Sequence, residues 1–526
     1  MSNPDPNSLV EYGARRVIIT LTVILCSLLE LIDTTIVNVA TTTLAGNLGA
    51  TFSEVSWVIA AYAIANVIVV PMSGWLSSQF GRKNYFACSV AIFTIASFMC
   101  GQSTSIWMLV FWRFIQGIGG GALIATSQSI LAEIYPKEKL GMASAMFGMG
   151  VILGPTLGPL FGGYLIDHFS WPVIFYVNVP FGIIAVFLTI KYIRNNPFQK
   201  KMEGGVDWLG MGLLIAGIGG LQLFLEQGEQ EDWFESRYIL MVFIISVVSI
   251  IGFIWRELTV KNPIVDLRIV KKGNVSIGIV MSFILGFVLF GTVFIIPIYM
   301  QRFLGFTAQQ TGALFTPGAL LTGMCMPLVG MSLQKGAQPK FLIAAGFTIT
   351  ACFVFWCSFI ITPATDASEF FWPLILRGLG LGLLFVPLTN MILGGLEGRD
   401  IASASGLSSM VRQIGGSISV ALIGVFSDRL SAQHRADLLS SLSTYDAATN
   451  ERVSAVSQAL MRNTSDAAIA TKQTYTVLDG IVFKQAYILT YINIFQYMAL
   501  FVLCILPLIL FAKTYKMKKG LGDAAH

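Results

Sequence analysis

The sequence predicts an all-α polytopic membrane protein, on the basis of its composition and its apolar runs. Of the 526 residues, 55% are hydrophobic and only 12% are charged, whereas a soluble globular chain carries roughly 25% charged residues. Apolar runs of the length that a membrane-spanning helix needs, about 20 residues, recur along the chain. Too little polar surface is available to cover a fold of this length in water, so a soluble multidomain enzyme is excluded.

Fourteen apolar segments follow one another, and each is expected to form a membrane-spanning helix. They lie at about 17–39, 55–76, 86–101, 107–130, 142–166, 173–193, 208–225, 238–255, 274–299, 309–333, 341–361, 371–393, 402–426 and 488–511. Lys and Arg concentrate in the connections that share a side with the N-terminus, as at Arg82 and Lys83 and at Lys271 and Lys272. Because short cytoplasmic connections carry the excess of positive charge, both termini are predicted to be cytoplasmic.

A weak internal repeat divides the chain into two halves. Arg113, Gln116 and Gly117 in the fourth segment are echoed by Arg377 and Gly378 in the twelfth, 264 residues after Arg113. Two six-helix bundles with an extra helix pair between them would produce this repeat, with a substrate cavity at their interface. The predicted units are a cytoplasmic N-terminus at 1–16, a bundle at 17–193, the extra pair with its flanking loops at 194–272, a bundle at 273–511 and a cytoplasmic tail at 512–526.

The second predicted bundle includes one long exoplasmic loop, at 427–487. This loop is rich in Ser, Ala, Thr and Gln, and its leucines and valines recur at near-helical spacing. Two interpretations remain open. The loop could be a solvated helical excursion tethered to the bilayer, or it could be a docking surface for another protein.

Several classes of chemistry find no residues to support them. The seven cysteines all lie within apolar runs and the three histidines are far apart, so no metal site is predicted. No stretch matches the P-loop pattern that cradles phosphates, and no basic block is dense enough to indicate nucleic-acid binding. A membrane-embedded enzyme would need a nucleophile–base or metal constellation, which the sequence lacks. We therefore expect a transporter that has no cofactor and is driven by an ion gradient.

The first segment contains two acidic residues, Glu30 and Asp33. A charged carboxylate at the centre of a membrane helix costs about 2.5–3.5 kcal/mol and usually faces a cavity or a partner. Burial disfavours the charged form, so Asp33 is a candidate for loading and releasing protons. Glu30 shares its face of the helix and is expected to titrate with it, or to reach exoplasmic water or a salt bridge instead. Arg113 could pair with either acid, or bond helix carbonyls.

Glycines recur at every fourth position of the fifth segment, interrupted by prolines. They would form a small-residue face against which another helix can press closely, and the prolines would bend the helix. We expect this face to make a tight, bendable contact that seals a cavity. The residues concerned are Gly150, Gly154, Pro155, Gly158, Pro159 and Gly162.

Two further sets of residues are candidates for transport. The turn after the second segment contains Gly74, Gly81, Arg82 and Lys83, whose basic side chains could bond helix-end carbonyls or simply mark topology. Polar and aromatic residues within the spans could line the substrate cavity, or belong to ordinary helix packing. These candidates are Asn38, Tyr62, Asn66, Gln116, Gln128, Phe294, Tyr299, Arg377 and Asn390.

Four motifs together resemble the signatures of the major facilitator superfamily. They are LIDTTIVNVA at 31–40, GWLSSQFGRK at 74–83, RFIQGIGGG at 113–121 and GMGVILGPTLGPLFGG at 148–163. With fourteen predicted spans, the chain is similar to the fourteen-spanner drug:proton antiporters of that superfamily. NVPFGI, NPIVDL, FVPLT and RQIGGSI, at 178–183, 262–267, 385–389 and 412–418, extend the resemblance along nearly the whole chain.

The resemblance implies a function and a set of roles. Asp33 matches the proton-coupling acid, Arg113 the arginine of the proton relay, and Gly154-Pro155 the core of the antiporter motif. It implies proton-driven export of hydrophobic or amphipathic drugs across the bacterial inner membrane by alternating access. Similar pumps work with a periplasmic adaptor and an outer-membrane channel, for which the long loop would be the docking site. A dedicated exporter of one endogenous metabolite, siderophore or lipid remains the alternative. The sequence departs from the family at Ser78, where the turn motif usually has Asp.

Overall fold

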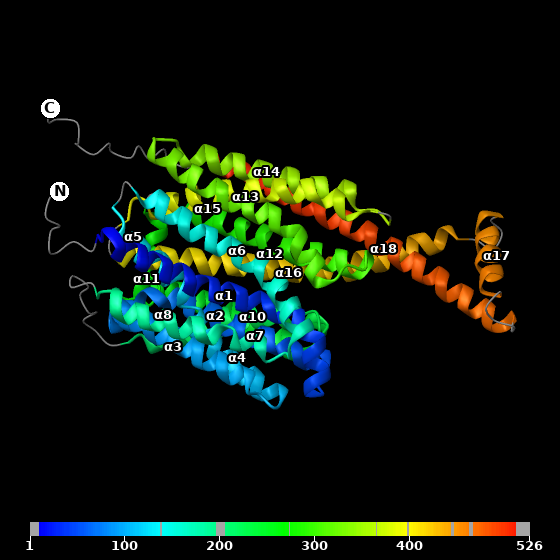
Figure 1. Ribbon diagram of the computed structural model, residues 1–526, viewed down its shortest axis with the longest axis horizontal. Coiled ribbons are helices and arrows are strands. Elements are labelled where there is room, and N and C mark those ends of the chain that lie inside the picture. Colours follow the sequence, from blue (N-terminus) through cyan, green and yellow to red (C-terminus); the bar gives the residue numbers. More distant parts are fainter. Residues whose placement is uncertain are drawn as a thin grey trace.

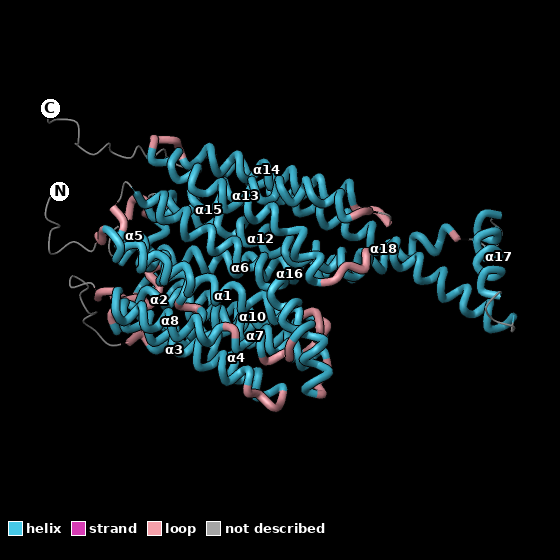
Figure 2. The backbone as a smooth tube through the Cα atoms, in the orientation of Figure 1, coloured by secondary structure: helices cyan, strands magenta, loops and turns pink. Residues whose placement is uncertain are grey.

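The computed structural model describes residues 10–136, 139–195, 206–272, 274–363, 365–396, 399–442, 447–461 and 467–511. All regular secondary structure in these ranges is helical (Figure 2). Thirteen helices are long and apolar enough to cross a membrane, and α6 (Leu140–His168), bent by about 40° near Pro155, adds a fourteenth span. The predicted all-α fold with fourteen spans is confirmed in this part of the chain. The predicted terminal segments at 1–9 and 512–526 lie outside the described residues.

The first half of the chain forms one group of packed helices. Its other elements are α1 (Gly13–Leu48), α2 (Phe52–Phe80), α3 (Arg82–Gly101), α4 (Ile106–Gly120), α5 (Leu123–Ile134), α7 (Val173–Tyr176) and α8 (Asn178–Tyr192). The fourth predicted span is divided between α4 and α5, because the helix breaks after three successive glycines that end at Gly121. α1 packs against α6 along one face and against α5 and α8 along others.

The second half repeats this arrangement. Its spans are α12 (Val275–Phe303), α13 (Ala308–Gln334), α14 (Pro339–Ile360), α15 (Phe371–Leu393), α16 (Arg399–Ser441) and α18 (Ala467–Ile505), which a 3₁₀ turn, η6 (Leu506–Phe511), extends. The two halves meet where α13 packs on α6 and where α16 packs on α2 and α5. α1 begins and α18 ends at the same end of the bundle (Figure 1).

The extra helix pair joins both halves. It comprises α9 (Trp208–Leu214), a π-helical turn at Ile215–Gly219, α10 (Gly220–Gln227) and α11 (Arg237–Thr259). The side chain of Gln222 on α10 donates a hydrogen bond to Ser417 Oγ of α16 (2.8 Å). Ser56 of α2 donates a hydrogen bond to Gln230 Oε1, just beyond α10 (2.9 Å). The pair is therefore a lateral bridge between the first and second halves.

α16 and α18 continue far beyond the bundle, and α17 (Ala447–Met461) lies across their tip (Figure 1). The predicted spans at 402–426 and 488–511 are the inner parts of these longer helices. Arg435 of α16 pairs with Asp479 of α18 at 2.6 Å, which ties the two projecting helices together. The described part of 427–487 is thus a helical projection, which agrees with the near-helical spacing of its leucines and valines.

Candidate functional site

The carboxylate of Asp33 lies at the centre of a buried polar cluster in the first half. Arg113 Nη1 of α4 donates to Asp33 Oδ2 at 2.5 Å, and both side chains are almost completely buried. Gln116 Nε2 and Asn178 Nδ2 each donate to Asp33 Oδ1 at 2.9 Å. Three helices, α1, α4 and α8, therefore converge on one carboxylate, which accepts hydrogen bonds from three side chains.

Arg113 is itself held in place on every side. Its Nε donates to the carbonyl of Val58 at 3.2 Å, and its Nη1 also donates to Gln116 Oε1 at 2.8 Å. The guanidinium carbon lies 4.2 Å from the centroid of the Tyr62 ring, a cation–π contact. The glycines that follow Arg113 permit this arrangement, since a methyl group added at Gly117 would lie 2.5 Å from the carbonyl oxygen of Tyr62. The ion pair joins α1 to α4, and both of its charged side chains are shielded from solvent.

Glu30 is buried in a separate environment, close to the second half. Its Oε1 accepts from Asn66 Nδ2 at 2.9 Å, and its Oε2 accepts from the backbone N–H of Ile124 at 3.2 Å. Ile124 is in the first turn of α5, so the carboxylate satisfies a helix end that the break between α4 and α5 exposes. Arg412 of α16 lies within electrostatic range of Glu30. The two acids of α1 thus have different partners, and only Asp33 pairs with Arg113.

The glycine face of α6 packs against α1. A methyl group added at Gly154 would lie 2.5 Å from Leu31 Cβ, and one added at Gly162 would lie 2.8 Å from Ile36 Cγ1. Gly150 faces Ile24 of α1, and Gly158 faces Thr35. The absence of side chains lets the two backbones approach closely along the helix that carries Asp33. The bend in α6 lies along this contact.

The turn motif closes one end of the bundle. A methyl group at Gly74 would lie 3.3 Å from the backbone of Ala402, at the start of α16. Arg82 is buried in an ion pair with Glu133 of α5. Gly81 has a φ of +82°, which favours glycine, and the backbone N–H of Lys83 donates to Asn195 Oδ1 at 3.0 Å. Ser78 donates to the carbonyl of Trp75 within its own helix, so Glu133 supplies the carboxylate for Arg82.

The two halves are joined by polar bonds on the side where this turn lies. Ser405 of α16 donates to Gln128 Oε1 of α5 at 2.7 Å. Gln128 Nε2 donates to Thr389 Oγ1 of α15 at 3.3 Å. The rings of Phe147 and Phe385 lie 6.3 Å apart, one from each half. These bonds and the Gly74 contact, here named the gate, hold the two halves together at this end of the bundle.

The remaining candidate cavity residues are placed in different settings. Asn38 is exposed on α1, whereas Phe294 and Asn390 are half-buried. Tyr299 is buried, and its hydroxyl donates to the carbonyl of Thr362 at 2.9 Å, within the second half. Arg377 is also buried in the second half, where its Nε donates to Thr292 Oγ1 at 3.2 Å. Tyr62, Asn66 and Gln116 belong to the clusters around the two acids.

Sequence reasoning assigned no role to Asn178 or Glu133. Asn178 bonds both Asp33 Oδ1 and Ser97 Oγ, the latter at 3.1 Å. A polar residue within an otherwise apolar span was the available signal for Asn178, since such a group needs a partner in lipid. Glu133 near the end of the fourth predicted span was a similar signal, because it is an acid close to a basic turn.

Comparison with known proteins places this arrangement in a family. A profile described as Major Facilitator Superfamily matches residues 23–420. The chain belongs to the major facilitator superfamily. It is 34% identical to the multidrug export protein EmrB of Escherichia coli (strain K12) over 514 residues, which cover 98% of each chain. It is 32% identical to the fatty acid resistance protein FarB of Neisseria gonorrhoeae over 502 residues, which cover 95% of this chain and 97% of the relative.

A solved structure gives the same answer for the fold. The proton:xylose symporter XylE of the major facilitator superfamily aligns with a TM-score of 0.57, covering 95% of this chain and 99% of that one. At 13% identity the likeness concerns the fold alone. The superfamily membership, which the motifs predicted, is confirmed, and the chain closely resembles EmrB. The profile match ends within α16, before the helical projection.

Proposed function

We propose that this major facilitator protein is a proton-driven antiporter that exports hydrophobic or amphipathic compounds from the bacterial cytoplasm across the inner membrane. The observation that carries the proposal is the buried ion pair of Asp33 and Arg113, closed at 2.5 Å within a membrane span. The similarity to EmrB, a multidrug export protein, supports the substrate class. The proposal includes the orientation in the membrane: both termini and the turn with Arg82 would face the cytoplasm.

Protonation of Asp33 would drive the conformational change. A proton on the carboxylate removes its charge and leaves Arg113 without its counter-ion, and breaking a buried pair costs about 3–5 kcal/mol. Loss of the ion pair would favour a rearrangement of α1, α4 and α8. The glycine face of α6 has no side chains that would obstruct a movement of α1 along it. A membrane potential of 100 mV supplies about 2.3 kcal/mol per charge. Protonation from the exoplasmic side would release the substrate, and deprotonation toward the cytoplasm would reset the pair.

The test is substrate-induced dissipation of an imposed pH gradient in everted membrane vesicles. Cationic dyes and lipophilic weak acids are the first compounds to add. We expect the wild type to dissipate the gradient on addition of a substrate, and Asp33→Asn, which keeps the size of the side chain, to give no response. Glu226→Gln on α10 is the matched control, since Glu226 is also an acid within a span, and its partner among the described residues is Gln222 of the lateral bridge.

Either of two results would overturn this proposal. An unchanged response in Asp33→Asn would assign the coupling proton to another group, with Glu30 the first alternative. A wild type that responds to no compound of the panel would exclude broad drug export. The second result would favour a dedicated endogenous cargo.

We further propose that the helical projection docks a periplasmic adaptor protein, which in turn reaches an outer-membrane channel. The projection exposes large apolar side chains outside the bundle, and exposed apolar surface of this kind is typical of protein interaction sites. These side chains are Leu439, Leu442, Met461, Ile469, Tyr475, Val477 and Ile481. The protein would be the inner-membrane part of a three-component pump, with the adaptor and the outer-membrane channel as the other two parts.

A pair of assays separates docking from transport. Replacing Ile469 and Tyr475 by Ser is expected to abolish co-purification of an adaptor from membranes of cells that express both proteins. Gradient dissipation in vesicles should remain, because neither residue contacts the Asp33 cluster. Export from intact cells should fall. Retained co-purification would contradict the docking proposal and leave the antiport proposal standing.

A second candidate, export of lipids that carry a carboxylate, is favoured by the environment of Arg412. Its guanidinium is buried, donates to Ser409 Oγ at 3.3 Å and lies 5.4 Å from the centroid of the Phe385 ring. No carboxylate of the described residues lies within 4.0 Å of it. The similarity to FarB, a fatty acid resistance protein, supports this candidate. Arg412→Gln should then impair export of fatty acids more than export of a cationic dye; equal impairment would contradict it.

A further inference from the structure

The guanidinium of Arg113 is contacted from both α1 and α2. From α1, the carboxylate of Asp33 accepts a hydrogen bond from Nη1. From α2, the carbonyl of Val58 accepts from Nε at 3.2 Å, and the centroid of the Tyr62 ring lies 4.2 Å from the guanidinium carbon. Only the α1 contact involves a second charge. A loss of charge on Asp33 would therefore alter the α1 contact and leave both α2 contacts in place.

No other carboxylate is placed to replace Asp33 as the counter-ion. Within the part of the chain that the structure describes, Asp33 is the only acid within 4.0 Å of the guanidinium of Arg113. Glu30, the other acid of α1, already accepts from Asn66 and from the N–H of Ile124. Once Asp33 is neutral, the buried cation of Arg113 therefore depends on uncharged groups.

An aromatic ring can stabilise a buried cation without carrying a charge. The face of the ring is electrostatically negative and attracts a guanidinium, most strongly where water is excluded. Tyr62 is only 2% exposed. A carboxylate beside the cation offsets this attraction, so the ring should contribute most when Asp33 is neutral. Phe175 of α7 offers a second ring, but its centroid is 5.8 Å away, close to the limit of about 6 Å for such a contact.

Two glycines of α4 fix the position of the Tyr62 ring independently of the ion pair. A methyl group added at Gly117 would lie 2.5 Å from the carbonyl oxygen of Tyr62, and one added at Gly120 would collide with its hydroxyl. α4 thus packs against Tyr62 both at its backbone and at the end of its side chain. Because the packing of α2 on α4 holds the ring, the ring does not need the charge of Asp33 to stay beside Arg113.

We propose that Tyr62 is a positioning residue whose ring holds the guanidinium of Arg113 in place while Asp33 is neutral. This role rests on the proposed antiport, in which Asp33 loses and regains its charge in each cycle. The ion pair joins α1 to α4 only in the charged state, whereas the contact between Tyr62 and Arg113 persists in both states. Protonation then frees α1 from a unit of α2 and α4 that stays together.

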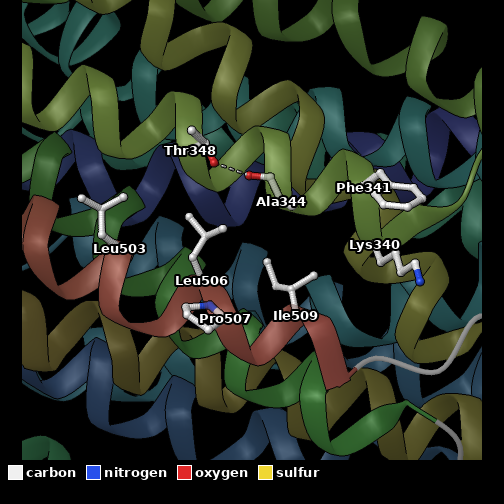
Figure 3. Close-up of a pocket in the computed structure, with 8 residues that line it drawn as sticks. All are labelled: Lys340, Phe341, Ala344, Thr348, Leu503, Leu506, Pro507 and Ile509. Carbon is white, nitrogen blue, oxygen red and sulfur yellow. Dashed lines mark hydrogen bonds between the residues drawn. The ribbon is translucent and has the colours of Figure 1, made fainter.

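The buried position of Tyr62 favours this role over a contact with substrate, which a polar aromatic residue within a span could also make. Side chains that can meet a lipid or a substrate are accessible, as in the groove of about 450 Å³ that α14 forms with the end of α18 and η6 (Figure 3). There, Phe341 and Leu503 are 65% and 50% exposed. The ring of Tyr62 is instead almost completely enclosed by protein.

The test is a double-mutant cycle on the full-length protein, measured by chemical unfolding in detergent. Asp33→Asn removes the charge and keeps the size, and Tyr62→Leu removes the ring. We expect Tyr62→Leu to lower the folding equilibrium constant about fivefold more in the Asp33→Asn background than in the wild type, the effect of one buried cation–π contact. Tyr62→Phe keeps the ring and should have the same effect in both backgrounds. The matched control is Tyr299→Leu, at a buried tyrosine of the second half, whose effect should also be the same in both.

The results of the cycle separate the ring from the hydroxyl and from general packing. Equal effects of Tyr62→Leu in the two backgrounds would overturn the proposal. A background dependence as large in Tyr62→Phe as in Tyr62→Leu would also overturn it, because the hydroxyl would then be responsible. If the combination of Tyr62→Leu with Asp33→Asn does not fold, although each single variant and the Tyr299→Leu combination do, the result supports the proposal as the same coupling at a larger size.

Transport kinetics give a second readout, which a merely structural role would not move in the same way. In everted vesicles, Tyr62→Leu should lower the maximum rate of gradient dissipation about fivefold, at an unchanged half-saturating substrate concentration. A rise in that concentration at an unchanged maximum rate would make Tyr62 a substrate contact and overturn the proposal. If the wild type dissipates no gradient, the antiport proposal fails, whereas the unfolding cycle still tests the contact of Tyr62 with Arg113.

Discussion

Arg113 and Arg377 are paired by the internal repeat, yet their surroundings differ. Arg113 in the first half has a carboxylate at 2.5 Å, a backbone carbonyl and an aromatic ring. Arg377 in the second half bonds Thr292 Oγ1 and lies 5.3 Å from the centroid of the Phe315 ring. α1 supplies two acids to its half, whereas its counterpart α12 contains none.

This difference shows how one scaffold is used in two ways. Both arginines follow the same local pattern, because each precedes glycines that let its helix approach a neighbour closely: Gly117 against α2 and Gly378 against Gly318 of α13. Among the described residues, only the first half places an ion-paired carboxylate beside this arginine. We therefore expect proton coupling to be concentrated in the first half, while the second half supplies cations that a proton does not switch.

The largest effect is expected when each arginine is replaced by Met. Arg113→Met leaves Asp33 buried without a counter-ion, so the free energy of unfolding should fall by about 3–5 kcal/mol at pH 8. Arg377→Met should cost only about 1 kcal/mol, the value of one hydrogen bond. Chemical unfolding in detergent measures both. Equal costs for the two substitutions would refute the comparison.

A second expected effect concerns the helix that carries the acids. Gly154→Val would force α6 away from Leu31, and overpacking of this kind costs about 1–3 kcal/mol. If this cost falls on the transport step, transport in vesicles should fall by about fivefold or more, since 1.4 kcal/mol corresponds to a factor of ten. Gly46→Val is the control, because Gly46 is an α1 glycine with no atom within 4 Å of an added methyl group. Similar losses in the two variants would contradict a role for the α1–α6 contact.

A smaller effect is expected at the second acid of α1. Glu30→Gln keeps the volume but removes one acceptor, so either Asn66 or the N–H of Ile124 loses its partner, at a cost of about 1–3 kcal/mol. Substrate-induced gradient dissipation should persist at a reduced rate, because the Asp33 cluster is untouched. Complete loss of dissipation, with wild-type folding, would instead make Glu30 the coupling acid.

The smallest effect is expected at the gate between the halves. Ser405→Ala removes the hydrogen bond to Gln128, worth about 1 kcal/mol, and should shift the population of the closed gate by about fivefold. Distances between spin labels at Lys83 and Lys335, measured by electron paramagnetic resonance, would report the opening of the gate. Ser332→Ala is the control, since that hydroxyl bonds only its own helix. Identical distance distributions in the two variants would exclude Ser405 as a gate contact.

The sequence alone predicted much of the fold because membrane insertion is governed by local properties. The length of each apolar run predicts a spanning helix wherever it falls, and the four-residue glycine spacing at 150–162 predicts a helix face without any knowledge of its partner. The cost of a charge in lipid likewise pointed to Asp33. The prediction was coarser where helices break or extend: the division of the fourth span at Gly121 and the length of α16 depend on tertiary packing.

What only the tertiary structure decided was which groups meet. Glu30 and Asp33 are three residues apart on the same helix face, so the sequence does not distinguish which of them pairs with Arg113. The orientation of α1 relative to α4 and α8 places Asp33 beside Arg113, Gln116 and Asn178. The break before α5 places the N–H of Ile124 beside Glu30. The partners of these two acids lie on other helices, so their identity is a property of packing. The sequence determined that these acids needed partners, and the fold determined which ones they received.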